Sequence, residues 1–245
     1  MIVEICCGSY QDGMTAYHQG AKRIELNSAL SLGGLTPSVA SLRLLKAQTD
    51  LTIICMVRPR GAGFDYRGQE LVQIQCEAEM LLENGADGLA FGFLNNDHTI
   101  DVPMTKFMVD LCHQYHKVAV FHRAFDCCDD LDTAIKQLID LKVDRVLTSG
   151  GKATAIEGQA CLRHLVDTYG NQIEILAGSG INADNAKDLI AATHVSQIHA
   201  SCKDYTTDVT TTGRDVSYAY YSNDHECDYE YVSGQNVLSL LDSVK

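Results

Sequence analysis

Five side chains of the sequence are of types that carry out acid–base chemistry, and each stands in or just after a short apolar run. Three are carboxylic acids and two are imidazoles: Glu4, Glu25, His122, Asp126 and His199. Such groups donate and accept protons in catalysis when a site brings them within hydrogen-bonding reach. A charged group in an apolar run also needs a partner, because its desolvation costs several kcal/mol. The five residues are therefore candidates for one catalytic set.

The carboxylates also have a purely structural interpretation. Glu4 and Glu25 are equally suited to form ion pairs with Arg58 and Arg123 inside the molecule. A network of this kind shifts pKa values without doing chemistry. The sequence leaves both interpretations open.

A second group of residues suits the binding of an anion. AGSGI (177–181) follows the seventh expected strand and precedes an expected helix, where glycine-lined backbone amides can hold an anion. TSGG (148–151), after the sixth strand, is a second candidate, and glycines that only form tight turns are the alternative. Guanidinium groups recognise carboxylates and phosphates. The predicted anion-binding residues are Arg58, Arg60, Arg123, Ser149, Gly150, Gly178, Ser179 and Gly180.

Short apolar runs rich in Val, Ile and Leu carry these residues, and longer amphipathic stretches separate the runs. The expected strands are 2–6, 23–27, 52–58, 88–92, 118–123, 145–149, 173–178 and 196–201. The stretches with helical periodicity are 42–48, 70–85, 104–116, 131–142, 155–170, 183–192 and 237–244. Strand–helix alternation is typical of parallel sheets. Eight strands predict a closed (β/α)₈ TIM barrel in a single domain of residues 1–245, with an open doubly wound sheet as the alternative.

A weak internal repeat bears on which side chains face the interior. The segments 20–27, 85–92, 142–149 and 194–201 superpose without gaps, although chance similarity of helix-to-strand joints is the alternative. Alternate strands of a TIM barrel supply the four side chains of one interior layer. The repeat predicts one layer of Glu25, Ala90, Leu147 and His199. It predicts a second layer of Asn27, Gly92, Ser149 and Ser201.

The composition and charge of the chain argue against two classes of partner, nucleic acids and membranes. The net charge of −13 argues against a nucleic-acid partner, because such a surface cannot replace phosphate counterions. No apolar run approaches the roughly 20 residues that cross a bilayer, and the N-terminus lacks a signal peptide. We therefore expect a cytoplasmic protein with no membrane partner. The ten cysteines contain no CxxC motif, which excludes zinc ribbons and thioredoxin-like sites.

Several ordered blocks between residues 2 and 202 are recognisable. They are EIC, RIEL, SLGGLTPS, RPRGAGFDY, DGLAFG, IDVP, FHRAFD, DRVLTSGG and IHAS. In this order and spacing they closely resemble the copper-homeostasis CutC family. The resemblance implies a TIM-type barrel, a cytoplasmic protein that is frequently a homodimer, and an association with copper. No organic cofactor is evident.

The association with copper raises the question of which residues of this chain could bind Cu(I). Cu(I) prefers thiolate and thioether ligands. Family members commonly carry cysteine in EIC and directly after RIEL, whereas this sequence has Cys6 and then Asn27. Cys7 is no substitute, because neighbouring strand residues point to opposite faces. We hypothesise a Cu(I) site formed by Cys6, Cys202 and His199.

Two other functions compete with copper binding. The first is an enzyme of the isomerase, aldolase or lyase type that uses the catalytic set on a small anionic or phosphorylated metabolite. The second is a scaffold that acts through its dimer surface. The sequence does not choose between an enzyme and a binding protein.

The segment 203–233 differs from the rest of the chain. It is polar, acidic and rich in tyrosine, and it is longer than the usual connection within a barrel. We expect an irregular segment that serves as a lid, as a subunit contact or as a partly disordered loop. A final helix over 234–245 follows it.

Overall fold

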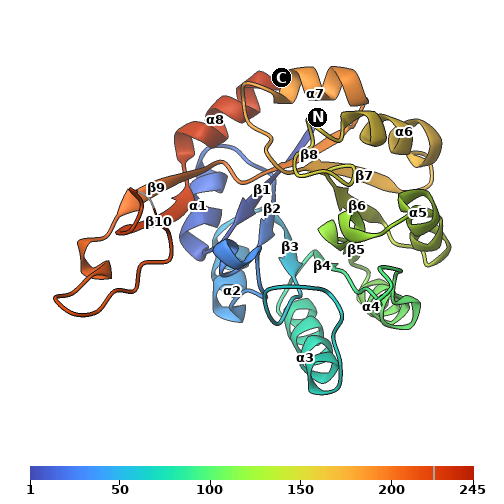
Figure 1. Ribbon diagram of the computed structural model, residues 1–245, viewed down its shortest axis with the longest axis horizontal. Helices are drawn as coiled ribbons and strands as arrows, with labels where there is room; N and C mark the ends of the chain where they lie inside the picture. The colour runs from blue at the N-terminus through green and yellow to red at the C-terminus, as the bar shows by residue number, and fades with distance from the viewer. Residues whose placement is uncertain (223) are drawn as a thin grey trace.

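The computed structural model describes residues 1–222 and 224–245, and its centre is a closed barrel of eight parallel strands in chain order (Figure 1). The strands are β1 (Ile2–Cys7), β2 (Arg23–Leu26), β3 (Thr52–Met56), β4 (Gly88–Phe91), β5 (Val118–Phe121), β6 (Arg145–Thr148), β7 (Glu174–Gly178) and β8 (Gln197–Ala200). The first and last strands close the ring, with Glu4 opposite His199. The predicted TIM barrel is thereby confirmed, and the open sheet is excluded.

The helices surround the barrel on its outside (Figure 1). They are α1 (Tyr10–His18), α2 (Val39–Gln48), α3 (Gln69–Glu83), α4 (Val102–Gln114), α5 (Leu131–Asp140), α6 (Gln159–Tyr169), α7 (Ala186–Thr193) and α8 (Gly234–Ser243). Shorter 3₁₀ turns are η1 (Leu30–Leu32), η2 (Arg123–Cys127) and η3 (Val209–Thr211). The helical periodicity predicted every α-helix except α1. Asp12, Gly13 and Ala16 form the buried side of α1, so its apolar signal is weak.

Strand residues alternate between the barrel interior and the helical layer. Ala90 belongs to a small interior cluster with Ile54, Met56 and Val120, whereas the intervening residues pack in the large apolar layer beneath the helices. Glu25, Leu147 and His199 line the upper end of the same interior. The first predicted layer thus lies inside the barrel.

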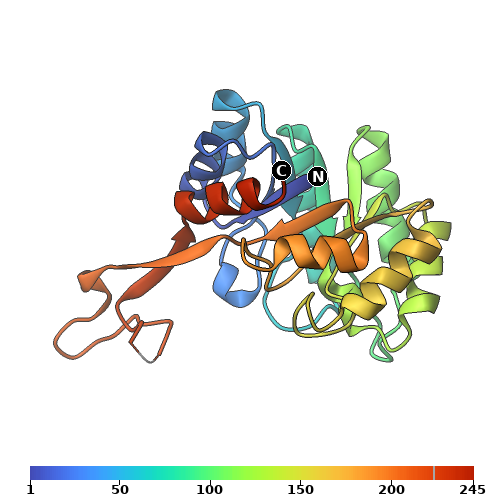
Figure 2. The ribbon, with the colours of Figure 1, turned by 90° about the horizontal axis from the view of Figure 1, so that it is seen from above.

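Residues 203–222 and 224–232 form an arm that projects from the side of the barrel near α1 (Figures 1 and 2). β9 (Lys203–Thr207) and β10 (Asp228–Val232) pair in antiparallel register at its two ends, which the sequence did not predict. The residues described between these strands are irregular as expected, apart from η3 and an isolated bridge between Thr212 and Ser217. Tyr218 of the arm is 84% exposed. A hollow of about 790 Å³ separates the arm from the start of α1 and contains none of the predicted site residues. The arm does not cover the barrel opening.

The two chain ends lie close together (Figure 1). Met1 and Lys245 border the same hollow beside α8. Among the described residues, no helix combines the length and apolar character that crossing a membrane requires.

Candidate functional site

The carboxyl ends of the barrel strands surround a cavity of about 630 Å³, which we call the mouth cavity. Functional groups of TIM-barrel proteins gather at this end. Its lining residues are Cys6, Glu25, Asn27, Gly33, Met56, Arg58, Phe64, His122, Arg123, Asp126, Cys127, Leu147, Gly151, Lys152, Ala153 and His199. The predicted catalytic residues all line it apart from Glu4.

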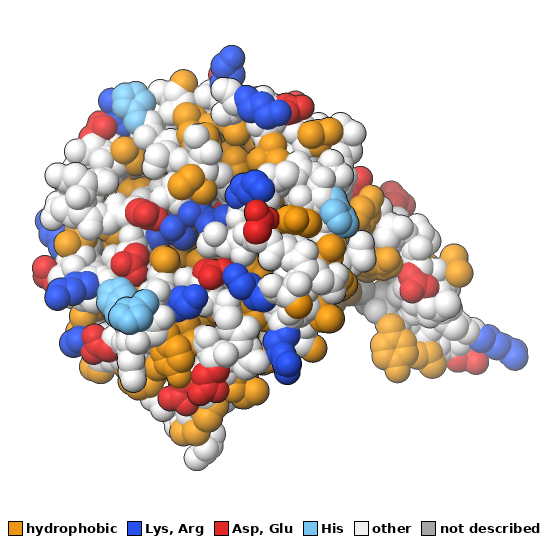
Figure 3. All heavy atoms as spheres, turned by 180° about the vertical axis from the view of Figure 1, so that it is seen from behind, with side chains coloured by type: hydrophobic (Ala, Val, Ile, Leu, Met, Phe, Trp, Pro, Cys, Tyr) orange, Lys and Arg blue, Asp and Glu red, His pale blue; other side chains and the backbone are white. Residues whose placement is uncertain are grey.

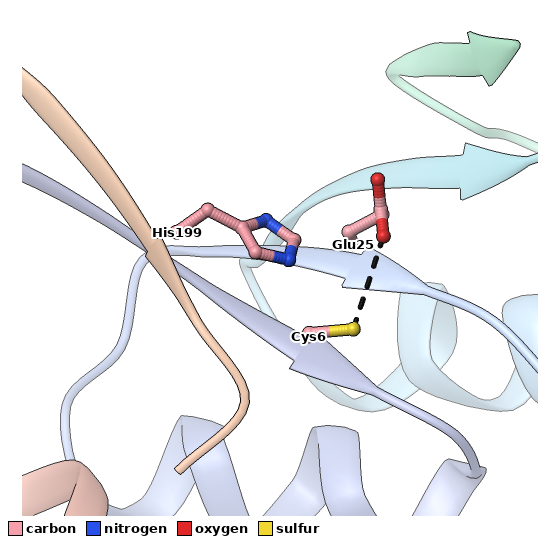
Figure 4. Close-up of side chains that lie close together, drawn as sticks. All are labelled: Cys6, Glu25 and His199. Atoms are coloured by element: carbon pink, nitrogen blue, oxygen red, sulfur yellow. Dashed lines mark hydrogen bonds between the residues drawn. The ribbon is translucent and has the colours of Figure 1, made fainter. Parts of the chain in front are cut away.

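Cys6, Glu25 and His199 form a compact cluster on one wall of the mouth cavity (Figure 4). They come from β1, β2 and β8, which are neighbours because the barrel closes. The Sγ, carboxylate and imidazole ligand atoms lie within 4.8 Å of one another. The Cys6 thiol donates a hydrogen bond to Glu25 Oε2 at 3.8 Å.

Asn27 lies directly beside this cluster. Its Nδ2 donates to Glu25 Oε2 at 2.9 Å and lies 3.5 Å from Cys6 Sγ. The side chain at position 27 therefore lies against the Cys6 thiol. A cysteine at this position, as the family commonly has, would place a second thiol there.

Glu4 lies behind the cluster and holds the imidazole of His199. Its Oε1 accepts from His199 Nδ1 at 2.9 Å, and its Oε2 lies 2.8 Å from Arg23 Nε. Burial opposes ionisation of Glu4, but the hydrogen bond and charge of His199, together with Arg23, outweigh burial and lower its pKa. Glu4 is a positioning residue, since it does not face the cavity.

The cluster has a defined protonation pattern. Burial opposes the charge on His199, but its hydrogen bonds with Cys6 and Glu4 and the charge of Glu25 prevail, so its pKa is raised well above the usual value. Burial raises the pKa of the Cys6 thiol to about 12. Burial and the nearby charge of Glu4 also raise the pKa of Glu25. The cluster therefore holds an imidazolium beside a neutral thiol.

The opposite end of the barrel is filled by paired charges. Arg23 Nη2 donates to Gln197 Oε1 at 2.6 Å, and Arg145 contacts Glu174 Oε2 at 2.7 Å. The Gln197 side chain also donates a 2.9 Å hydrogen bond from Nε2 to Glu174 Oε2, so it links Arg23 to the Arg145–Glu174 ion pair. The surface at this end shows basic side chains interspersed with acidic ones (Figure 3). A structural ion network thus exists, but its residues differ from the predicted ones. Among the described residues, Glu4 pairs with Arg23 and Arg145, whereas Arg58 and Arg123 have other partners and Glu25 takes no part.

His122 lines the mouth cavity at the end of β5, on the side of the ring away from β1. Its Nδ1 accepts a hydrogen bond from the Ala124 backbone N–H at 3.1 Å. Gly92 makes room for the ring, since a Cβ there would lie 2.5 Å from an imidazole carbon. Burial and the charge of Arg58 lower the pKa of His122 to about 3. The ring is therefore neutral and carries its proton on Nε2.

Asp126 is fully engaged by its neighbours. It accepts from Arg123 Nε at 2.8 Å, from the Thr148 hydroxyl, and from the backbone and hydroxyl of Ser149. Gly151 adds a further backbone N–H at 3.0 Å. Asp126 therefore shapes the loop after β6 and is not a free base.

The two arginines after β3 anchor loops. Three backbone carbonyl groups of the loops after β2 and β3 accept from the Arg58 guanidinium at 2.6–3.0 Å. Arg60 pairs with Glu70 and lies 4.9 Å from the ring centre of Tyr66, outside the mouth cavity. Arg58 thus contacts the cavity with most of its donors occupied, and Arg60 does not take part.

The glycine loop after β7 is turned away from the mouth cavity. Ser179 donates from its hydroxyl to the Ala153 carbonyl at 2.7 Å, which ties this loop to the loop after β6. Gly178 packs against a neighbouring side chain of β6, where a Cβ would lie 2.6 Å away. Gly180 lines a separate hollow of about 490 Å³. Of the predicted loop residues, Gly150 also lies outside the mouth lining, where a Cβ would meet a backbone oxygen at 2.5 Å.

Cys202 does not join Cys6. It is buried in the apolar layer and borders the separate hollow, together with Ser201. The structure therefore replaces Cys202 by Glu25 in the predicted group of Cys6, Cys202 and His199. Ser201 likewise departs from the second predicted layer.

Lys152 and Phe64 are lining residues that the sequence analysis did not select. Lys152 directly follows TSGG, so a basic residue after a glycine loop was an available signal. Phe64 belongs to the long loop after β3, where an aromatic side chain follows no periodic pattern.

Comparison with known families agrees with this geometry. A family model described as the CutC family matches residues 1–204. The chain belongs to the CutC family. A CutC family protein of Treponema denticola is 46% identical over 197 residues, which cover 80% of this chain and 79% of the relative. The copper homeostasis protein cutC homolog of Drosophila melanogaster is 36% identical over 205 residues, covering 82% of this chain and 77% of the relative.

Solved structures extend the comparison to the fold. The crystal structure of CutC from Streptococcus agalactiae has a TM-score of 0.77 at 28% identity, covering 82% of this chain and 98% of that one. Thiamine phosphate pyrophosphorylase from Pyrococcus furiosus has a TM-score of 0.59 at 13% identity, covering 99% and 95% of the two chains. The second likeness shows the barrel fold alone.

Proposed function

We propose that this CutC-family chain binds Cu(I) in the mouth cavity through Cys6 Sγ and His199 Nε2, with Glu25 beside them. The observation that carries the proposal is the cluster of three ligand atoms within 4.8 Å of one another. The name of the Drosophila relative, a copper homeostasis protein, indicates the metal.

The chemistry of the donors fits Cu(I) in part. Thiolate and thioether sulfur are preferred ligands of Cu(I), and imidazole also suits copper. Cys6 supplies the thiolate, and the thioether of Met56 lines the same cavity. Bonds of about 2.0–2.3 Å, as in tetrahedral zinc sites, place two ligands of one metal about 3.3–3.8 Å apart. The ligand atoms of the cluster lie within 4.8 Å of one another, so small side-chain movements suffice.

Glu4 supports the proposed role of His199. Because Glu4 holds Nδ1, the other ring nitrogen is left toward Cys6 and Glu25. Metal-binding histidines are commonly oriented by a carboxylate in this way. Binding requires Cys6 and His199 to release their protons, so Cu(I) affinity should rise with pH.

A competition titration with a Cu(I) chelator under anaerobic conditions tests the proposal. We expect one equivalent of Cu(I) in the wild type, none above background in Cys6→Ser, and wild-type uptake in the matched control Cys202→Ala. Uptake that survives Cys6→Ser, or that is lost only in Cys202→Ala, would contradict the proposed ligands.

Asn27→Cys sharpens the same test. The new thiol would lie against Cys6, because the Asn27 amide is 3.5 Å from its sulfur. A second thiolate should tighten Cu(I) binding about 100-fold, which corresponds to about 2.7 kcal/mol. An unchanged affinity would show that Cu(I) binds elsewhere.

We also propose a cellular location and an oligomeric state for the protein. Ten unpaired cysteines suit a reducing compartment such as the cytoplasm. The exposed tyrosines of the arm offer a contact surface for the homodimer that the family resemblance implies. Deleting the arm should then shift the sedimentation mass from dimer to monomer.

A further inference from the structure

We propose that the mouth cavity has a second ligand site, for a small organic anion that bears a carbonyl or hydroxyl oxygen. His122 Nε2 would donate to that oxygen, and Lys152 would face the anionic group. This site lies at the end of β5 and in the loop after β6, apart from the strands that carry the Cu(I) ligands. It goes beyond copper binding and does not depend on it.

His122 provides the first observation. Its side chain lines the mouth cavity and is only 4% exposed, yet its Nε2 has no hydrogen-bond partner among the described residues. The Ala124 backbone N–H donates to Nδ1, so the proton of the neutral ring must be on Nε2. A buried donor without an acceptor costs free energy, about as much as a lost hydrogen bond. An acceptor oxygen of a ligand would remove that cost.

The charge balance of this wall provides the second observation. Asp126 is the carboxylate that lines this wall, but Arg123 and four other donors already satisfy it. Lys152 is exposed at the rim and forms no ion pair with any other residue that the structure describes. The rim therefore carries an uncompensated positive charge on a chain whose net charge is −13. A ligand with a negative group would balance it.

The volume of the mouth cavity and its apolar lining residues indicate what kind of ligand would fit. The cavity of about 630 Å³ is within the range of small-molecule sites. Met56, Phe64 and Leu147 give it an apolar side between the polar groups. A short carbon skeleton would pack there, with its oxygen toward His122. A carboxylate and a phosphate ester share this chemistry, and the experiment separates them.

Calorimetric titration of copper-free protein tests the site. The probes are 2-oxoglutarate for the carboxylate class and dihydroxyacetone phosphate for the phosphate class, with uncharged dihydroxyacetone as the control. We expect one of the two anions to bind with a dissociation constant in the millimolar range or below, and dihydroxyacetone to give no measurable heat. The anion that binds identifies the class.

Three variants assign the contacts. His122→Gln keeps an N–H near Nε2 and should retain most of the affinity, whereas His122→Phe should weaken binding about tenfold. Lys152→Met, on the surface, should weaken binding and reduce its dependence on salt. If His122→Phe does not fold, Lys152→Met still decides whether the rim charge is used.

The outcomes separate this site from the Cu(I) site. Cys6→Ser should bind the anion as the wild type does, and His122→Gln should take up Cu(I) as the wild type does. Heat from neither anion would overturn the proposal, as would binding that both His122→Phe and Lys152→Met leave unchanged. Loss of Cu(I) uptake alone would overturn only the copper proposal.

Discussion

The two ends of the barrel treat their polar groups in opposite ways. At the amino ends of the strands, buried charges face opposite charges, as Arg23 faces Glu4 at 2.8 Å and Arg145 faces Glu174 at 2.7 Å. At the carboxyl ends, His122 Nε2 and Glu25 Oε1 are buried without hydrogen-bond partners among the described residues. The difference indicates that one end stabilises the fold and the other is arranged for ligands.

Glu4 connects the two ends, since it contacts the paired charges below and His199 above. One carboxylate thus balances the structural network and also orients a residue of the candidate site. Substitution of one carboxylate on each side of this boundary tests whether the two ends differ in this way.

Glu4→Gln should have the largest effect on stability. The substitution leaves Arg23, Arg145 and the His199 imidazolium without their shared counter-charge, which should lower the free energy of unfolding by about 3–5 kcal/mol. Urea unfolding monitored by circular dichroism measures the change.

Glu25→Gln is the matched control from the mouth cavity. Because burial raises the pKa of Glu25, its charged form is disfavoured in the folded protein, and removing the charge should cost less than about 1 kcal/mol. Equal losses in Glu4→Gln and Glu25→Gln would remove the distinction between the two ends.

The pH dependence of stability should identify the neutral His122. Its pKa falls from the ordinary 6.5 to about 3 on folding, so the unfolded chain binds more protons between these values. Stability should therefore be complete above pH 6.5 and decline as the pH falls, by up to about 1.4 kcal/mol per unit for this residue. At pH 5 the loss of unfolding free energy that is due to His122 is about 2 kcal/mol.

The variant His122→Gln removes the pH-dependent part of the unfolding free energy that is due to His122. We expect the difference in unfolding free energy between wild type and variant to change steadily from pH 7 to pH 5 and to be constant above pH 7. Parallel curves over the whole range would show that the ring is not held neutral.

Arg60→Gln should have the smallest effect. Arg60 pairs with Glu70 at the surface, and exposed pairs contribute about 0–1 kcal/mol. Stability should change by less than about 1 kcal/mol, and Cu(I) uptake should be unchanged. A variant that loses Cu(I) would show that Arg60 itself contributes to the mouth cavity.

The sequence predicted the barrel because short apolar runs alternate with helical patterns along most of the chain. It also placed Glu25 with His199 in one interior layer and Cys6 with His199 in one site. Closure brings all three together, because it places β8 beside β1. Both predictions depend on periodicity and topology, which short-range residue patterns encode well.

The third proposed ligand, Cys202, was misplaced for a physical reason. Strand residues alternate between faces, so an inward His199 already places residue 202 on the outer side. Cys202 also has a φ of 46°, which turns the chain out of the strand before the arm. The partners of Arg58 were likewise hidden, because backbone carbonyl acceptors leave no trace in residue types.

The neighbouring chain ends have a consequence for the order of the sequence itself. Met1 and Lys245 border one hollow, and Arg214 lies in an exposed bend of the arm. A circular permutant that links the present ends and begins at position 215 would keep every strand pairing of the barrel. The pairing of the eight strands, rather than the point at which the chain is opened, would then hold the barrel together.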